Sequence, residues 1–498
     1  MLDFVQNFPF FSIVLSLFGG SICAVLNEKH AKWVNTCLIF MVGVMSAAVL
    51  FYCLGTGDYF VYKMGHFPAP WGNEIRAGVL ESGMALFFSI IMLLSMTGGR
   101  KKITEEVEGS KINYYYTLVN LLLSSLLAII YTNDLFTAYV FVEINTISAC
   151  GLIMIRQNGR TIVAAVRYMI MSLLGSGLLL VGISMLYDLT GHLLMSNIKE
   201  SVALIYADGA YRVPLLVTIA LISVGLAIKS ALFPFHSWVP DAYGYSTASS
   251  ASILSSLVSK GYIFLLIKIF YRVIGFDIIT DSKIVNILFI FALIGMISGS
   301  LSAIQENDIR RMIAFSSVAQ IGYIYMGIGL GTEAGIIASL FHIISHASSK
   351  SLLFISAIGL TDVSNESREF IHLTGSGYRN RIAGIGFTVG SLSMVGIPLF
   401  SGFISKLLFA EAAVQNHGKM LPTVIVLAVS TILNAIYFMK TVIRIYTPIS
   451  SPGQEKRTWK NQKVYAITIA CFIGVNVIIG LLSQPIVNLI TMGLEMFA

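Results

Sequence analysis

Residues 227 to 243 read AIKSALFPFHSWVPDAY, an apolar segment that two prolines interrupt shortly after a lysine. Pro234 follows Lys229 by five residues, and His236 and Pro240 come next. Proline removes a backbone hydrogen-bond donor and clashes with the preceding helical turn, so a helix kinks or unwinds there. We therefore predict an interrupted helix beside Lys229.

Apolar segments of this kind fill the whole chain. Of 498 residues, 56% are hydrophobic and 11% are charged, and the mean hydropathy is +0.81. Soluble domains have about a quarter of their residues charged, so a water-soluble globule is excluded. A membrane helix needs roughly 20 apolar residues. Fourteen segments qualify, at residues 9 to 27, 34 to 55, 77 to 98, 113 to 131, 135 to 155, 163 to 187, 213 to 235, 246 to 270, 284 to 303, 311 to 330, 335 to 359, 382 to 410, 421 to 446 and 465 to 491.

The twelfth segment carries a second interruption. Residues 394 to 411 read MVGIPLFSGFISKLLFAE, which places Gly396 and Pro398 ahead of Lys406. In transporters such breaks commonly line ion sites, at corresponding positions of two repeats. The seventh and twelfth segments are five apart, as two inverted five-helix repeats require.

Basic residues give an orientation. The odd-numbered loops hold eighteen Lys and Arg, and the other face holds seven. By the positive-inside rule the odd loops are cytoplasmic, so we expect both termini outside a cell membrane. Topology then explains the net charge of +7 without a nucleic-acid partner. The basic residues of the odd loops include Arg100, Lys101, Lys102, Arg156, Arg160, Arg310, Lys456, Arg457 and Lys460.

Charged residues also lie inside the segments. Lys268, Lys440 and Arg444 are near helix ends, where we expect their long side chains to reach the interface. Four lysines and one glutamate are deeper, where a charge costs at least about 2.5 to 3.5 kcal/mol and is expected to have a partner or a task. They are Lys229, Lys260, Lys350, Lys406 and Glu143. The alternative is that these charges only pair helices together, and Lys350 fits a packing role as well as a functional one.

Other polar residues accompany these charges. On the eleventh segment His342, His346 and Lys350 are spaced by four, which places them on one helical face and indicates a relay. Serines, among them Ser256, line the eighth segment beside Lys260. They either hold water there or hydrogen-bond to neighbouring helices.

Four stretches in order resemble a known family. They are FPFHSWVPDAYGYSTASSASILSSLVSKGYIFLLIKIF (233 to 270), ENDIRRMIAFSSVAQIGYI (306 to 324), FHIISHASSKSLLFISAIG (341 to 359) and GIPLFSGFISKLL (396 to 408). They are similar to the antiporter-like subunits shared by respiratory complex I, Mrp-type sodium/proton antiporters and membrane-bound energy-converting hydrogenases. GHFPAPWGNEIRAG (65 to 78) further resembles the Mrp-type D subunit and its hydrogenase relatives.

The resemblance implies an all-α membrane protein of about fourteen transmembrane helices. Two inverted five-helix repeats, with broken seventh and twelfth helices, would make up its centre. The expected parts are an N-terminal three-helix segment (1 to 110), the first repeat (111 to 272), the second repeat (273 to 447) and a C-terminal helix (448 to 498).

The resemblance also implies an ion path. The family's glutamate matches Glu143, and its further lysines and polar relay match positions in this chain. Near Glu143, Lys229 would hold its proton, and it would release that proton when Glu143 is neutralised or moves away. Histidines gain and lose a proton near neutral pH, so they would pass the released proton on. The matched residues are Lys229, Lys260, His342, His346 and Lys406, with His236, Ser256, Ser316 and Gln320 as supporting polar groups.

The expected function is movement of H⁺ or Na⁺ within a multi-subunit redox-driven pump or antiporter. The expected partners are other membrane subunits, including further antiporter-like ones, and the lipid bilayer. Five scattered cysteines form no metal-type spacing, so we expect no cofactor and no metal in this chain. Two alternatives stay open, a free-standing secondary transporter and a non-conducting structural subunit.

Overall fold

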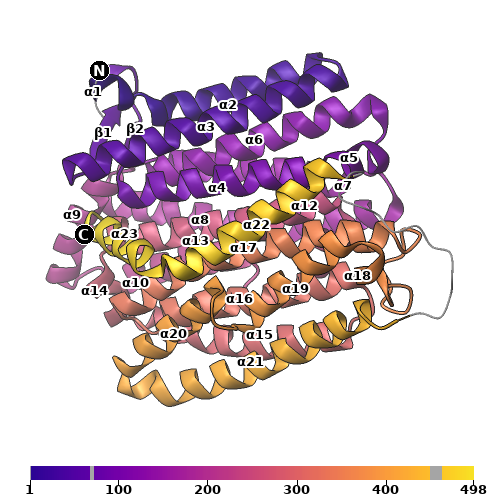
Figure 1. Ribbon diagram of the computed structural model, residues 1–498. Helices are drawn as coiled ribbons and strands as arrows, with labels where there is room; N and C mark the ends of the chain where they lie inside the picture. Colours follow the sequence, from indigo (N-terminus) through magenta and orange to yellow (C-terminus); the bar gives the residue numbers. More distant parts are fainter. Residues whose placement is uncertain (1, 68–71, 449–461, 498) are drawn as a thin grey trace.

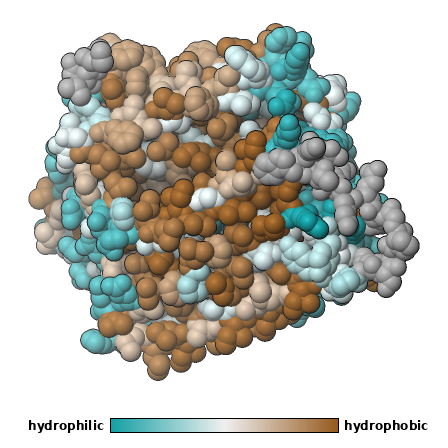
Figure 2. Space-filling view, in the orientation of Figure 1, coloured by the Kyte–Doolittle hydropathy of each residue, from teal (hydrophilic) through white to brown (hydrophobic). Residues whose placement is uncertain are grey.

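Helices make up almost all the regular structure of the computed structural model, which describes residues 2–67, 72–448 and 462–497 (Figure 1). Within these ranges thirteen helices are long and apolar enough to cross a membrane. The chain is therefore an all-α, multi-pass membrane protein. The long helices run side by side, and apolar side chains cover the middle of the face in Figure 2, with hydrophilic ones towards both ends.

The bounds of the elements are as follows. The first half holds α1 (Leu2–Val5), α2 (Phe8–Val25), α3 (Glu28–Thr56), α4 (Val79–Gly98), α5 (Arg100–Glu106), α6 (Ile112–Tyr131), α7 (Leu135–Met154), α8 (Gly159–Thr190), α9 (Met195–Asp208), α10 (Arg212–Lys229), α11 (Val239–Tyr245), α12 (Ala248–Ile253) and α13 (Ser259–Ile269). The second half holds α14 (Phe276–Asp281), α15 (Ile284–Gln305), α16 (Ile309–Gly329), α17 (Glu333–Asp362), α18 (Ser376–Arg379), α19 (Arg381–Val395), α20 (Ser401–Val414), α21 (His417–Ile445), α22 (Lys463–Leu481) and α23 (Ser483–Glu495). Two π-helical segments, η3 (Leu254–Val258) and η4 (Phe270–Ile274), flank α13, and two short 3₁₀ turns lie at Met64–His66 and Gly109–Lys111.

Both proline-containing stretches interrupt a helix. After α10 ends at Lys229, the next helix, α11, begins at Val239. The predicted segment 382 to 410 is divided into α19, of 15 residues, and α20, of 14, so neither is among the thirteen long helices. Each break contains a non-glycine residue in the left-handed region, Ala231 at φ 67° and Leu399 at φ 88°. Such backbone is strained and persists where its surroundings impose it.

Several short elements were not predicted, among them two strands and a helix. Strands β1 (Phe60–Lys63) and β2 (Glu74–Ala77) pair antiparallel, with Phe60 opposite Ala77. Helix α9 follows α8 outside the long apolar segments. Residues 68–71 of the stretch 65 to 78 lie outside the described ranges, as do Lys456, Arg457 and Lys460.

Side-chain caps set several helix starts in the centre of the chain. Asp308 accepts hydrogen bonds from the backbone N–H groups of Arg310 and Arg311 and starts α16. Thr247 accepts from the N–H of Ser250 and starts α12. These caps satisfy N–H groups that have no partner within the helix.

Glycines allow α8 and α10 to approach closely. A Cβ added at Gly225 would lie 2.7 Å from the carbonyl oxygen of Gly175. Small residues let membrane helices pack backbone to backbone. This contact brings the hydroxyl groups of α8 against the end of α10, where Lys229 lies.

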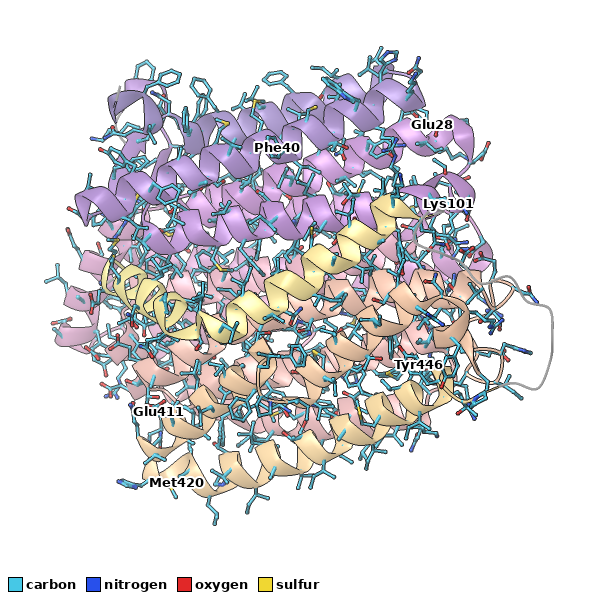
Figure 3. The ribbon with its side chains drawn as sticks, viewed as in Figure 1. Glu28, Phe40, Lys101, Glu411, Met420 and Tyr446 are labelled. Carbon is cyan, nitrogen blue, oxygen red and sulfur yellow. The ribbon has the colours of Figure 1, made fainter. Side chains whose placement is uncertain are left out.

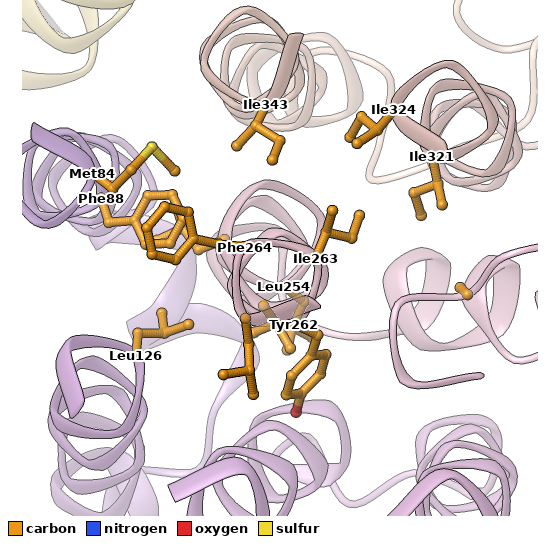
Figure 4. Packing of buried hydrophobic residues seen from close by; sticks show 14 of the residues in the cluster. Met84, Phe88, Leu126, Leu254, Tyr262, Ile263, Phe264, Ile321, Ile324 and Ile343 are labelled. Atoms are coloured by element: carbon orange, nitrogen blue, oxygen red, sulfur yellow. The ribbon is translucent and has the colours of Figure 1, made fainter. Parts of the chain in front are cut away.

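The segment from α12 to η4 forms the centre of the bundle. Every residue from Ala248 to Ile274 is buried. Figure 4 shows this helix, which carries Ile263 and Phe264, among helices that carry Phe88, Leu126 and Ile321. Its lysines are therefore enclosed by protein on all sides.

Candidate functional site

The structure pairs Lys229 with Glu143. The Lys229 ammonium, at the end of α10, lies 3.3 Å from Oε1 of Glu143 on α7. The lysine side chain is 0% exposed and the glutamate side chain 24%. Lys229 also donates to Thr146 Oγ1 at 2.8 Å and to Ser172 Oγ at 3.1 Å. Every hydrogen-bond direction of the ammonium group is thus directed at an oxygen.

Sequence reasoning missed the polar shell of this pair. Ser176 donates a hydrogen bond to Glu143, and the Tyr262 ring centroid is 5.5 Å from the Lys229 Nζ. Ser172 and Ser176 are four residues apart on α8, a spacing that places both on one face and was a detectable signal. Tyr262 gave no such signal, because it comes from α13.

Lys260 is fully buried on α13 and has no carboxylate within ion-pair distance among the described residues. It donates to the backbone oxygen of Ser255 at 2.6 Å and to Ser259 Oγ at 3.1 Å. The Ser255 carbonyl belongs to the π-helical turn η3. Such turns loosen the regular helical pattern and are frequent at functional sites.

His342 and His346 lie side by side on α17, with ring centroids 5.9 Å apart. His342 Nδ1 is 2.6 Å from Ser405 Oγ, and its ring stacks on Tyr323 at 5.5 Å. His342 Nε2, both ring nitrogens of His346 and Nε2 of Gln320 are buried without a hydrogen-bond partner in the described protein. Buried polar atoms are ordinarily satisfied, often by ordered water. These atoms are therefore free to hydrogen-bond to water.

Lys350 and Ser256 differ in their surroundings. Lys350 Nζ donates to the backbone oxygen of Ile313 at 2.9 Å and to Ser316. Ser256 is hydrogen-bonded to Ser351 at 2.7 Å rather than to a lysine. Ser256 therefore links two helical segments, which agrees with the alternative that the serines hydrogen-bond to neighbouring helices. Ser316, in contrast, accepts a hydrogen bond from Lys350.

Lys406 lies beside the second break. It donates to the Val395 carbonyl at 2.6 Å, which is the last residue of α19, and to Thr431 Oγ1 at 3.0 Å. Gly396 has φ 90°, and a Cβ there would lie 2.9 Å from Cδ of Lys406. The break therefore supplies both a carbonyl acceptor and the space for the lysine stem.

The predicted residues form two groups. In one group, His342 and His346 lie together on α17, which also carries Lys350, and His342 contacts Ser405 on α20, next to Lys406. Glu143 and Lys229 form the other group. His236 lies in the first break, stacked on Phe233 at 5.4 Å. Of the four deep lysines, only Lys229 has a carboxylate partner among the described residues, so mutual pairing does not account for the other three.

An asparagine outside the predicted set organises the second break. Asn476 on α22 accepts hydrogen bonds from Ser349 at 2.8 Å, Ser393 at 3.0 Å and Ser401 at 3.1 Å. These serines come from α17, α19 and α20. One amide oxygen thus holds three helices together.

We predict that Asn476→Leu lowers the free energy of unfolding by about 1 to 3 kcal/mol, because buried hydroxyls lose their acceptor. Thermal unfolding of the purified protein in detergent measures this. Asn476→Asp keeps an acceptor oxygen and serves as the control. Equal stability of the leucine variant and the native protein would contradict the role of this network.

One prediction about the lysines was wrong. Lys268 does not reach the interface: it is fully buried and donates to the carbonyls of Ile129 at 3.1 Å, Ile130 at 2.5 Å and Thr132 at 2.9 Å. The end of α6 presents these free carbonyls, which attract a cation. These three carbonyls accept hydrogen bonds from the Lys268 ammonium group, so the lysine is stable inside the protein and does not need to reach the bilayer interface.

A second buried ion pair lies near Lys268. Arg272 NH1 is 3.3 Å from Oε1 of Glu81, with side chains 3% and 1% exposed. Arg272 also donates to Asn133. The predicted segment 246 to 270 ends before Arg272, and Glu81 in the segment 77 to 98 was not among the predicted deep charges. The two residues are 191 positions apart in the chain, so no local spacing pairs them.

Known proteins share this architecture. A chain from the structure of the membrane-bound sulfane sulfur reductase (MBS), an archaeal respiratory membrane complex, superposes with a TM-score of 0.88 at 26% identity, over 98% of this chain and 97% of that one. NADH-quinone oxidoreductase subunit N of Desulforudis audaxviator is 32% identical over 82% of this chain and 79% of its own length. The D subunit of the Na(+)/H(+) antiporter of Alkalihalophilus pseudofirmus is 26% identical over 86% and 84%.

The fold and these likenesses define a membrane antiporter-like subunit. The family described as "NADH:quinone oxidoreductase/Mrp antiporter, TM" matches residues 132–433. This range covers more than half of the chain and includes Glu143, both breaks and all four deep lysines. The chain belongs to this family.

Proposed function

We propose that this chain translocates protons, or sodium ions, across the membrane as one subunit of a larger complex. The observation that carries the proposal is the Glu143–Lys229 pair, held at 3.3 Å beside an interrupted helix. A buried charge in a membrane helix is costly and marks an ion or proton pathway by default. Family membership supports the same function.

The proposed path starts at Glu143 and Lys229. Neutralisation or movement of Glu143 removes the charge that stabilises the Lys229 ammonium, so the lysine releases its proton. Lys260, His342 and His346 then carry the proton to Lys406, with Lys350 as an added buried base beside Ser316. The hydroxyls of Thr146 and Ser172 are donors and acceptors for the first transfer. The unpartnered ring nitrogens of His342 and His346 provide sites for water in the second part.

We further propose a fourteen-span topology in which α19 and α20 together form one interrupted span. The first five-helix repeat would then extend from α6 to η4, and the second from α15 to α21. The fourth span of each set is interrupted, which supports the inverted repeat.

The odd-numbered loops would be cytoplasmic and both termini outside a cell membrane. Ion pairs support this grouping of loops, because Arg156, Arg310 and Arg368 lie 3.7, 3.9 and 4.0 Å from the same carboxylate, Glu106. In this cluster the charge of Arg310 holds the pKa of Arg368 below its usual range. Cations that follow α7, begin α16 and follow α17 thus gather at one end of the bundle.

The driving force would come from other subunits. NADH-quinone oxidoreductase and the sulfane sulfur reductase are redox assemblies by name, and the antiporter that contains the related D chain exchanges Na⁺ and H⁺ by name. We propose that this chain likewise works with further membrane subunits, including other antiporter-like ones.

Replacing Glu143 by alanine in the assembled complex tests the proposal. We expect ion uptake into sealed membrane vesicles to fall about tenfold, because an adjacent carboxylate shifts a proton-binding equilibrium by an order of magnitude or more. Uptake is measured separately with pH-sensitive and Na⁺-sensitive dyes and normalised to the amount of assembled complex.

Glu411→Ala, at the α20 end remote from the pair, is the matched control and should leave uptake unchanged. Undiminished uptake by the Glu143 variant with intact assembly would favour a non-conducting structural subunit. Full activity of the purified single chain would favour a free-standing transporter.

A further inference from the structure

A basic hollow of about 410 Å³ lies between α3, α4, α5, α17 and α22, at one end of the bundle. In Figure 3 the label Lys101 marks this end, next to the start of α22. Five cations line the hollow: Lys32, Arg100, Lys101, Lys102 and Lys463. Two carboxylates, Glu105 and Asp362, also line it. The hollow is therefore positively charged.

Three of these cations are available to a ligand. Lys101 and Lys102 lie 3.4 and 3.1 Å from Glu105, and Lys102 also pairs with Glu366. The side chains of Lys32, Arg100 and Lys463 have no ion pair or side-chain hydrogen bond within the part of the chain that the structure describes. An anion entering the hollow would thus meet three unpaired positive charges.

An apolar groove of about 420 Å³ continues from the hollow along α3, α4 and α22. The two share Thr97 and Val464 in their linings. None of the described residues that line the groove is charged, and Phe40 and Ile467 are exposed side chains within it. Figure 3 labels Phe40 along α3, on the apolar face that Figure 2 displays.

The groove points from the membrane surface towards its interior. Along α3, Phe40 follows Lys32 by eight residues, which is about 12 Å at 1.5 Å per residue. Along α22, Ile467 follows Lys463 by four residues, or about 6 Å. Both helices therefore place a cation at the aqueous end and apolar side chains one to two turns deeper.

We propose that the hollow and groove together bind an anionic phospholipid, with its phosphate among Lys32, Arg100 and Lys463 and one acyl chain in the groove. Basic pockets between membrane helices bind the head groups of anionic lipids. A free phosphate ion could bind in the hollow, but it has no acyl chain to fill the groove. This proposal does not depend on the ion path, because none of its residues belongs to that path.

Lipid exchange onto the purified, assembled complex tests the proposal. Native mass spectrometry would count phosphatidylglycerol and phosphatidylcholine molecules retained after titration in detergent. We expect one tightly held phosphatidylglycerol and no equivalent phosphatidylcholine. Each basic residue near an anionic lipid raises the binding affinity about fivefold. The triple variant Lys32→Gln, Arg100→Gln, Lys463→Gln should therefore bind phosphatidylglycerol roughly 100-fold more weakly.

A triple variant with the same net charge is the control. Lys29→Gln, Arg381→Gln and Lys440→Gln remove three exposed cations that do not line the hollow, and phosphatidylglycerol should stay bound. Cys37→Trp fills the groove and leaves the three cations in place, and it should also release the lipid. Equal loss from both triple variants, or unchanged binding by Cys37→Trp, would overturn the proposal.

Two further outcomes distinguish other occupants. Inorganic phosphate at millimolar concentration should not displace the lipid, and efficient displacement would mean that the hollow binds a free anion. A photo-crosslinking amino acid at Phe40 in the assembled complex should label phospholipid. Crosslinking to another polypeptide would show that a neighbouring subunit covers this face and would overturn the lipid site.

Discussion

Lys229→Ala in the assembled complex is expected to reduce ion translocation roughly 100-fold or more, the usual contribution of a positioned proton-transfer group. Among the described residues, Lys229 is the one deep lysine with a carboxylate partner, and its ammonium contacts Glu143, Thr146 and Ser172. Without the amine, the first transfer of the proposed path has no carrier. The measurement is the initial rate of ion uptake into sealed vesicles, normalised to assembled complex.

Lys229→Arg separates proton carriage from pairing. Arginine keeps the positive charge and can pair with Glu143, but it is not deprotonated in proteins. We expect this variant to assemble normally and still to lose translocation. Lys440→Ala, an exposed lysine on α21, should behave like the native protein. If Lys229→Arg pumped normally, Lys229 would be a helix-pairing residue only.

Glu81→Ala should lower the free energy of unfolding by about 3 to 5 kcal/mol, the usual effect of removing one partner of a buried ion pair. Without this carboxylate the Arg272 guanidinium stays almost fully buried and has no ion-pair partner within the described ranges. Its remaining side-chain hydrogen-bond acceptor among the described residues is the neutral amide oxygen of Asn133. Thermal unfolding in detergent and the yield of folded protein both report this change.

The double variant Glu81→Ala, Arg272→Met is the control for this prediction. It removes both charges, so no uncompensated ion remains, and it should be more stable than the single variant. If the single and double variants had the same free energy of unfolding, the ion pair would stabilise the fold through its packing alone and not through its charges.

The positions of the two breaks and the charged pair followed from sequence pattern. Pro234 and Pro398 are local signals, and each break begins within a few residues of where proline chemistry places it. Glu143 and Lys229 stand out because any charge in an apolar segment is unusual. Their mutual contact could be expected once the resemblance matched each of them to a charged position of the family.

Other features depend on contacts between distant segments and gave no local signal. Asn476 looks like an ordinary polar residue in an apolar helix, and only its position against three serines gives it a role. Lys268 was misjudged because its position near a helix end suggested that it reaches the interface, whereas the end of α6 supplies carbonyls there. The ion pair of Glu81 with Arg272 joins segments too far apart to be matched by spacing.

The enclosure of the segment from α12 to η4 has a consequence for biosynthesis. This segment carries Lys260, and a charge at the bilayer centre costs about 2.5 to 3.5 kcal/mol when a helix enters lipid alone. Its neighbours α16 and α17 follow it in the chain and emerge from the ribosome later. We therefore expect the segment to stay against α6 and α7, which precede it in the chain, until the second half of the protein surrounds it.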